Sequence, residues 1–285
     1  MKRVFRTSLL RKALFAILLA SSGGGIVYAK NAKPKKWHQK SLEELKNAKG
    51  FTWITKSTPH YDLFVDSGTL AEREIGQLER EMEDSLPGLQ KLLGGPLKAR
   101  LQAFVVSSEP RMNKLMGGGG LSTGFAWGTI ITMVYQQDLR DMGIHETCHN
   151  MARFLWGNSH AAWVNEGLAV YSENNWRGVP LHQLAKWLLD RHKIIPLNDV
   201  IAEGLHQKFN DMVTYPELGS FLKFVYETYG LDSVKVLWRR GAKGARKAFG
   251  KPLDAVEQEW LAALSQIDAT SVHYHYRGMS SGSRE

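Results

Sequence analysis

The sequence predicts an α+β protein in which a small mixed sheet comes first and a mainly helical C-terminal lobe follows. Segments with the residue pattern of strands lie between residues 51 and 135, whereas apolar residues recur at helical spacing from residue 138 to residue 267. The chain has 285 residues, of which 43% are hydrophobic, so it can bury a full core. Because the strands precede the helices and do not alternate with them, the two kinds of element should form separate layers.

The first 29 residues have the features of a secretory signal peptide. Basic residues up to Lys12 precede an apolar run over residues 13–20, and Val27-Tyr28-Ala29 has the small-x-small form of a cleavage site. The apolar run is shorter than the roughly 20 residues that a membrane span needs, which favours cleavage, with an uncleaved membrane anchor as the alternative. We therefore expect an exported protein, either periplasmic or secreted.

The net charge of +9 comes from the N-terminus and not from the part that folds. Ten of the 37 Lys and Arg residues lie within residues 1–40, which contain no acid, so 27 basic residues face 28 acidic ones in the rest. This balance predicts no nucleic-acid partner. Residues 30–50 form a basic linker that ends in a short helix. Weak contact of this basic arm with an anionic envelope or membrane surface is an alternative to simple solvation.

Cys148 is the one cysteine of the sequence, so no intramolecular disulfide can form. The sequence also lacks the cysteine pairs of a zinc finger, and any metal must therefore be held by His and carboxylate side chains. We expect the side chain of Cys148 to be buried on the apolar side of a helix.

The N-terminal elements follow from local patterns. Ser41 and Glu44 form a capping box that predicts a short helix. Residues 51–65 look extended, and residues 69–93 show the spacing of an amphipathic helix with a soft break at Pro87. Two further strands are expected over residues 101–106 and 124–135. Four glycines over residues 117–120 indicate a flexible turn, because no Gly-Lys-Ser/Thr follows as in a phosphate-binding loop.

The second half of the chain predicts a series of helices. Asp138 is placed to cap the first of them, which ends at Trp156-Gly157. The expected folded domain covers residues 51–268, and residues 269–285 are expected to be a disordered tail. The remaining predicted helices cover residues 161–173, 181–192, 215–229, 231–240 and 253–267.

A metal site is predicted within the first of these helices. His145 and His149 are four residues apart, so both imidazoles lie on one helix face and can bind one ion. Glu166 lies on the next helix after a short loop, among mostly apolar neighbours. A hairpin of the two helices would complete a His₂Glu set for one zinc ion per chain. This set leaves a coordination position open, which is typical of catalytic and not of structural zinc sites.

The stretch from His145 to Glu173 resembles gluzincin zinc peptidases, and in particular the peptidase MA-like families. The resemblance is carried by His145-Glu146-Thr147-Cys148-His149, an HExxH motif, and by the Trp-x-Asn-Glu-Gly-x-Ala-x-Tyr segment that starts at Trp163. It implies a zincin-like core, metal ligands at His145, His149 and Glu166, and hydrolysis of a peptide or protein substrate. The chain departs from the large aminopeptidases in the shorter spacing between His149 and Glu166 and in lacking a Gly-Ala-Met-Glu-Asn motif, so aminopeptidase specificity is not implied.

Two further residues receive catalytic roles. Glu146 adjoins the first ligand, where a carboxylate can act as general base toward a water whose pKa zinc lowers to about 7. The resemblance alone suggests Tyr215 as the donor that stabilises the oxyanion, with Tyr171 as the second choice. His160 and Asn165 are expected to be an ordinary loop histidine and a helix-start asparagine, with hydrogen bonding to the metal ligands as the alternative for both.

Other functions stay open at this stage. The protein could be an inactive zinc-binding envelope scaffold or a membrane-anchored binding protein, although neither needs a base such as Glu146. Amide hydrolysis in a non-protein envelope substrate would use the same chemistry. For a peptide substrate, we expect the strand over residues 124–135 to form the cleft edge and to bind an extended peptide as an added strand, which proline at Ile131 would disrupt.

Overall fold

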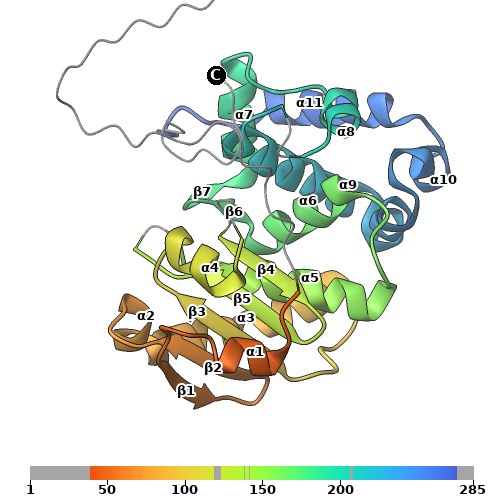
Figure 1. The fold of residues 1–285 in the computed structure, drawn as a ribbon. Coiled ribbons are helices and arrows are strands. Elements are labelled where there is room, and N and C mark those ends of the chain that lie inside the picture. The colour runs from red at the N-terminus through yellow and green to blue at the C-terminus, as the bar shows by residue number, and fades with distance from the viewer. Residues whose placement is uncertain (1–38, 119–122, 138, 141, 206–207, 275–285) are drawn as a thin grey trace, which may run out of the picture. The chain divides into compact units, whose positions relative to one another are not determined.

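The computed structural model describes residues 39–118, 123–137, 139–140, 142–205 and 208–274, all within one compact unit. The main sheet of this part has five strands in the order β1-β2-β3-β5-β4 (Figure 1). Strands β2, β3 and β5 are parallel, and β1 and β4 pair antiparallel to them at the two edges. The strands are β1 (Trp53–Ser57), β2 (Tyr61–Asp66), β3 (Leu101–Val106), β4 (Gly124–Trp127) and β5 (Ile130–Val134).

Burial explains which strands are central. All five residues of β5 are buried, and in β3 every residue except Gln102 is buried, because both faces of these strands are covered. Strand β1 lies at an edge, and its last three residues are exposed. The polarity of the segments therefore matches their order in the sheet.

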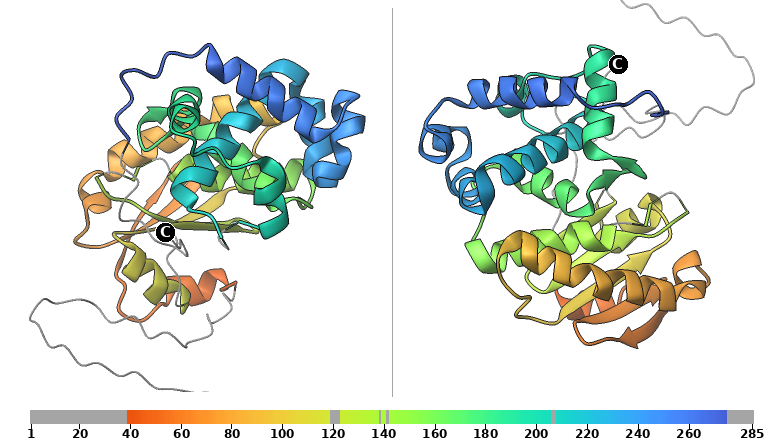
Figure 2. Two further views of the ribbon diagram at one scale, coloured as in Figure 1. Left: turned by 90° about the horizontal axis from the view of Figure 1, so that it is seen from above. Right: turned by 180° about the vertical axis from the view of Figure 1, so that it is seen from behind.

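Helices cover both faces of the sheet (Figures 1 and 2). On one face lie α1 (Leu42–Lys46) and α4 (Glu109–Met116), and on the other lie α3 (Ile75–Leu93) and α5 (Met142–Trp156). The short helix α2 (Leu70–Arg73) leads into α3. The expected capping box of α1 is present, with Ser41 and Glu44 bonded reciprocally.

The chain then builds a helical lobe on the far side of α5 from α3, as Figure 1 shows. Helices α6 and α9 form its centre, and their backbones approach closely at two glycines. A Cβ atom on Gly167 would lie 2.8 Å from the carbonyl oxygen of Leu218, and one on Gly219 would lie 2.5 Å from Val170. The elements of the lobe are α6 (Ala162–Glu173), β6 (Asn175–Trp176), β7 (Val179–Pro180), α7 (Leu181–Asp190), α8 (Leu197–Glu203), α9 (Asp211–Arg240), a 3₁₀ helix (Gly241–Gly244), α10 (Ala245–Phe249) and α11 (Leu253–Ser265).

The α+β class with a mixed sheet and a helical lobe is thus confirmed, but two expected single strands are hairpins. Residues 51–65 contain both β1 and β2, with a turn at Pro59 between them. Residues 124–135 contain β4 and β5, joined at Gly128, whose φ of 53° suits the turn. In residues 124–135 a largely apolar and β-branched run conceals the turn, whereas in residues 51–65 Pro59 is a turn signal that the prediction of one strand did not use.

The break predicted at Pro87 is wrong. Helix α3 continues through Pro87, which is exposed, and the break lies at Glu74, between α2 and α3. Proline removes one hydrogen bond on the solvent side of the helix, where water can satisfy the carbonyl. The break predicted between residues 229 and 231 is present as Gly230, with φ 78° inside α9.

Several expectations fall on residues outside the described ranges. These are the signal peptide over residues 1–29, the linker up to residue 38, the capping role of Asp138, and Gly119 and Gly120 of the glycine run. Among the described residues, no helix is both long and apolar enough to cross a membrane. The prediction of a disordered tail is wrong for its first part, since Val272 and Tyr274 are buried against residues of α7 and α9.

Candidate metal centre

Helix α5 carries the HExxH residues into the interior between the sheet and the helical lobe. The side chains of His145, Glu146 and His149 are 3–7% exposed. Apolar residues of the same helix, among them Met151, pack in the core and fix its rotation. The helix ends at Trp156, after which Gly157 adopts φ 81° and turns the chain toward α6.

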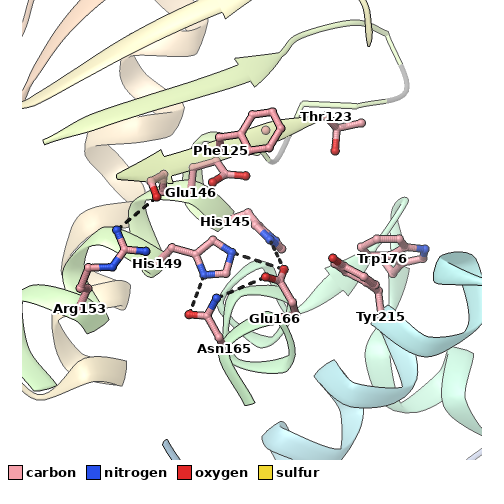
Figure 3. A pocket seen from close by; sticks show the side chains of 12 residues that line it. Thr123, Phe125, His145, Glu146, His149, Arg153, Asn165, Glu166, Trp176 and Tyr215 are labelled. Atoms are coloured by element: carbon pink, nitrogen blue, oxygen red, sulfur yellow. Dashed lines mark hydrogen bonds and ion pairs between the residues drawn. The ribbon is translucent and has the colours of Figure 1, made fainter. Parts of the chain in front are cut away.

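Helix α6 returns against α5 and brings Glu166 to the two histidines (Figure 3). The Oε2 atom of Glu166 lies 3.4 Å from Nε2 of His145 and 3.5 Å from Nε2 of His149. One ligand atom from each residue lies within 4.8 Å of the others. In a tetrahedral zinc site, ligand atoms about 2.0–2.1 Å from the ion stand about 3.3 Å apart. The donor set and its spacing therefore fit a zinc ion.

The second nitrogen of each imidazole is held by a residue of α6. The Nδ1 atom of His145 lies 2.9 Å from Oε1 of Glu173, and Nδ1 of His149 lies 3.1 Å from Oδ1 of Asn165. Since both oxygens are acceptors, each Nδ1 donates a proton, so Nε2 is the atom of each ring that can bind a metal. Asn165 also donates to Glu166 through Nδ2 at 3.3 Å. These contacts orient the three ligands before an ion binds.

The pKa values reflect the density of charge in this buried site. Burial would raise the pKa of Glu166, but the charge of His149 and hydrogen bonds from both imidazoles hold it well below its usual range. Burial would lower the pKa of His145, yet hydrogen bonds to Glu166 and Glu173 raise it well above 6.5. Burial raises the pKa of Glu146 to about 7, against the lowering effect of the two histidines.

Glu146 lies against the edge strand β4. A Cβ atom on Gly124 would lie 2.2 Å from Oε1 of Glu146, so the carboxylate fills the space that a side chain at this strand position would take. The absence of a side chain at Gly124 lets the carboxylate stand beside the metal ligands and face the cleft (Figure 3).

Two aromatic residues, Trp176 and Tyr215, form the wall of the site away from β4. Tyr215, on α9, contacts Trp176 of β6 with ring centroids 5.5 Å apart. Burial and a hydrogen bond with Glu166 raise the pKa of Tyr215 well above 10. The indole of Trp176 donates to the hydroxyl of Tyr274 at 2.8 Å, and that hydroxyl donates to the carbonyl of Met212 at 2.9 Å. The C-terminal segment therefore supports the wall.

The site opens into a cavity of about 300 Å³. Its walls come from the edge strand, the two motif helices, the β6 strand and α9, so both the sheet and the helical lobe contribute. The lining residues are Thr123, Gly124, Phe125, Ala126, His145, Glu146, His149, Arg153, Asn165, Glu166, Trp176 and Tyr215.

The structure brings together the five residues singled out from the sequence, namely His145, Glu146, His149, Glu166 and Tyr215. Other candidates lie elsewhere. Tyr171 does not line the cavity and packs on Tyr226 with centroids 5.6 Å apart. Cys148 is buried and packs in the core, as predicted. His160 is exposed and bonds through its backbone to Trp238.

Sequence reasoning missed Glu173, Arg153 and Gly124, and it misjudged Asn165. Glu173 had a usable signal, because it follows Glu166 by two helical turns and so lies on the same face of α6. Asn165 precedes the third ligand and was interpreted as a helix-start residue, but α6 starts at Ala162. No local pattern marks Gly124 as the neighbour of Glu146.

No family model and no curated protein matches the chain. Among solved structures, it is similar to a two-domain M1 zinc metallopeptidase, a mutant bound to L-arginine, with 15% sequence identity and a TM-score of 0.40. The match covers 75% of this chain and 50% of the metallopeptidase, so the chain spans about half the length of the protein that it matches.

Proposed function

We propose that the protein is a zinc-dependent hydrolase of peptide (amide) bonds, of the gluzincin type, with one zinc ion per chain. One observation carries the proposal: the Nε2 atoms of His145 and His149 and Oε2 of Glu166 converge while Glu146 stands beside these three residues as a non-ligating acid. A site that served stability alone would not need that additional buried carboxylate beside an open cavity.

The residues take distinct roles in this proposal. His145, His149 and Glu166 would hold the ion, oriented by Glu173 and Asn165. A zinc ion bound there would lower the pKa of a water molecule and polarise the amide carbonyl. Glu146 accepts the proton of the attacking water and delivers it to the leaving nitrogen. Tyr215 donates its hydroxyl proton in a hydrogen bond to the oxyanion, after turning from Glu166.

The edge strand β4 is the proposed binding surface for an extended peptide. The backbone N–H of Val134 donates to the carbonyl of Thr123, and bonded and non-bonded pairs alternate along an antiparallel ladder. Consequently, the backbone polar groups of Gly124 and Ala126 point away from β5 and toward the cleft. The carbonyl of Ala126 accepts a hydrogen bond from Arg153, in agreement with this direction. A peptide could pair with the outward N–H of Ala126 as an added strand.

The cleft edge is formed by β4 alone and not, as the sequence predicted, by the whole segment 124–135. Ile131 lies in β5, which is paired on both sides by β3 and β4, and its side chain is fully buried. A proline there would break the sheet and would not test substrate binding. Ala126 replaces it as the test position.

Location and partners complete the proposal. The leader over residues 1–29 supports export to the periplasm or medium, with cleavage favoured over anchoring. The near balance of 27 basic and 28 acidic residues after residue 40 supports a peptide or protein substrate and not a nucleic acid.

The test combines zinc content with hydrolysis. We expect about one zinc per chain in the protein purified without chelator, and much less in His149→Ala. Glu146→Gln should keep its zinc and lose hydrolysis of a mixed peptide library by about 10²–10⁴-fold. Full activity of Glu146→Gln, or a folded wild type that binds no zinc, would contradict the proposal. Cleavage of envelope polymers but of no peptide would favour an amidase.

A further inference from the structure

Arg153 stands in the wall of the catalytic cavity without an acidic partner. It lies on α5, four residues after His149, and its side chain is half-buried and lines the cavity (Figure 3). Its NH1 group donates to the backbone carbonyl of Ala126 at 3.2 Å. Within the described residues, no Asp or Glu pairs with this guanidinium, which has four further N–H donors.

Two other partly buried arginines are paired with acids: Arg111 binds Asp66 and Arg140 binds Glu74. A guanidinium kept out of bulk water without a counter-charge is unfavourable, so a residue in this state indicates an anionic ligand when it faces a cavity. Arg153 is also the only Lys or Arg among the described residues that line this cavity.

The position of Arg153 places it next to the reacting bond. Residues four apart on a helix have Cβ atoms about 5–6 Å apart, so the Arg153 side chain starts one turn from that of the metal-site residue His149. The bond to Ala126 holds the guanidinium beside β4, the strand proposed to bind the peptide backbone. The opposite end of the cavity is formed by Trp176 and Tyr215; the guanidinium of Arg177 lies 6.0 Å from the centroid of the Trp176 ring but is not among the described residues that line the cavity. Among the described lining residues, the cavity therefore has a cation at one end and aromatic rings at the other.

We infer that Arg153 determines specificity by binding a carboxylate of the substrate adjacent to the scissile amide, so that the enzyme selects acidic substrates. This inference rests on the proposed hydrolase function. A guanidinium binds a carboxylate through two parallel hydrogen bonds, which is stronger and more directional than a single contact. The carboxylate belongs either to an Asp or Glu side chain or to the C-terminus of the peptide, and both present the same group to Arg153.

A purely structural role for Arg153 makes a different prediction. If the residue only fastened α5 to β4 through Ala126, its loss would weaken hydrolysis of all substrates equally. A specificity role predicts a change in the ratio of kcat/KM between acidic and neutral substrates. The ratio therefore separates the two roles.

The experiment uses matched peptides and three variants of the full chain. One peptide pair differs by Glu or Gln beside the cleaved bond, and a second pair differs by a free or amidated C-terminus. We expect the wild type to favour the carboxylate member of one pair by about 10- to 100-fold in kcat/KM. Arg153→Met should abolish this ratio, Arg153→Lys should keep part of it, and Arg153→Glu should shift the preference to a Lys-containing peptide. Arg73→Met, at an exposed position on α2, is the matched control.

Binding supplies a readout that does not depend on turnover. Calorimetric titration of zinc-loaded Glu146→Gln with the same peptides should show tighter binding of the carboxylate member, and adding Arg153→Met should remove the difference. Hydrolysis with the same ratio in wild type and Arg153→Met would overturn the inference and leave the hydrolase proposal intact. Arg153-dependent binding without any hydrolysis would retain carboxylate binding and reject the hydrolase. Absence of both hydrolysis and Arg153-dependent binding would overturn both.

Discussion

The imidazole of His145 donates from Nδ1 to Oε1 of Glu173 at 2.9 Å, across 28 residues of sequence and between two helices. Both side chains are about 5–6% exposed, so this bond is shielded from water. It fixes the ring and its tautomer, and it thereby prepares Nε2 for a metal.

Removing the charge of Glu173 should weaken metal binding. We expect Glu173→Gln to reduce zinc affinity by about 10- to 100-fold, because the imidazole loses a charged acceptor that raises its basicity. Competition with a zinc chelator of known affinity measures this change. Glu43→Gln, exposed on α1, is the control for a change of one surface charge. An unchanged zinc affinity in Glu173→Gln would mean that the ligand pair is oriented by other contacts.

The sequence contained most of the metal site but little of what surrounds it. His145 and His149 are related by one helical turn, so local periodicity was enough to predict that they converge, whereas Glu166 was predicted from a hairpin of two helices and from the resemblance to gluzincins. Gly124 meets the site through the packing of β4 on α5, which depends on strand pairing over long separations, whereas Arg153 lies on α5 four residues after His149, where helical periodicity could have indicated it. Periodicity carries no information on such pairing, and the same gap led to one strand being predicted where β4 and β5 form a hairpin.

Gly124 should be essential for activity and not for the fold. In Gly124→Ala, the new Cβ atom would lie 2.2 Å from Oε1 and 2.8 Å from Cδ of Glu146, so the carboxylate must move away from the strand. We expect hydrolysis to fall by about 10²-fold while zinc content is unchanged, since displacement of a catalytic group by about 1 Å has this effect. Gly88→Ala, at a helix position with free space, should retain full activity. Equal activity of the two variants would show that Glu146 is not the base.

The edge of β4 can be tested through one backbone donor. Ala126→Pro removes the N–H that points away from β5 and keeps the carbonyl that binds Arg153. We expect the KM for extended peptides to rise by about fivefold or more, because the variant loses one hydrogen bond to the substrate, which is worth about 1 kcal/mol. Ala126→Val keeps the N–H and controls for side-chain volume. A normal KM in the proline variant would exclude pairing of the substrate with this edge.

A buried acid behind the site should make stability depend on pH. Glu217, on α9, is fully buried, and its Oε2 accepts a hydrogen bond from the N–H of Ile195 at 3.1 Å. Within the described residues, no group bonds to its Oε1. Burial raises the pKa of Glu217 well above 4.5, with a further contribution from the nearby charge of Glu257.

The sign of the effect follows from this raised pKa. Below the ordinary pKa of about 4.3, the acid is protonated in both the folded and the unfolded chain, and its full contribution to stability is present. As the pH rises toward the folded-state pKa, only the unfolded chain releases the proton, and this contribution is lost. Glu217→Gln keeps an acceptor for Ile195 and cannot ionise. We therefore expect the variant to gain on the order of 1–3 kcal/mol in unfolding free energy over wild type between pH 5 and pH 8. Urea unfolding of both proteins measures this difference, with a chelator present so that metal binding does not contribute. A difference in unfolding free energy that does not change with pH would refute the prediction.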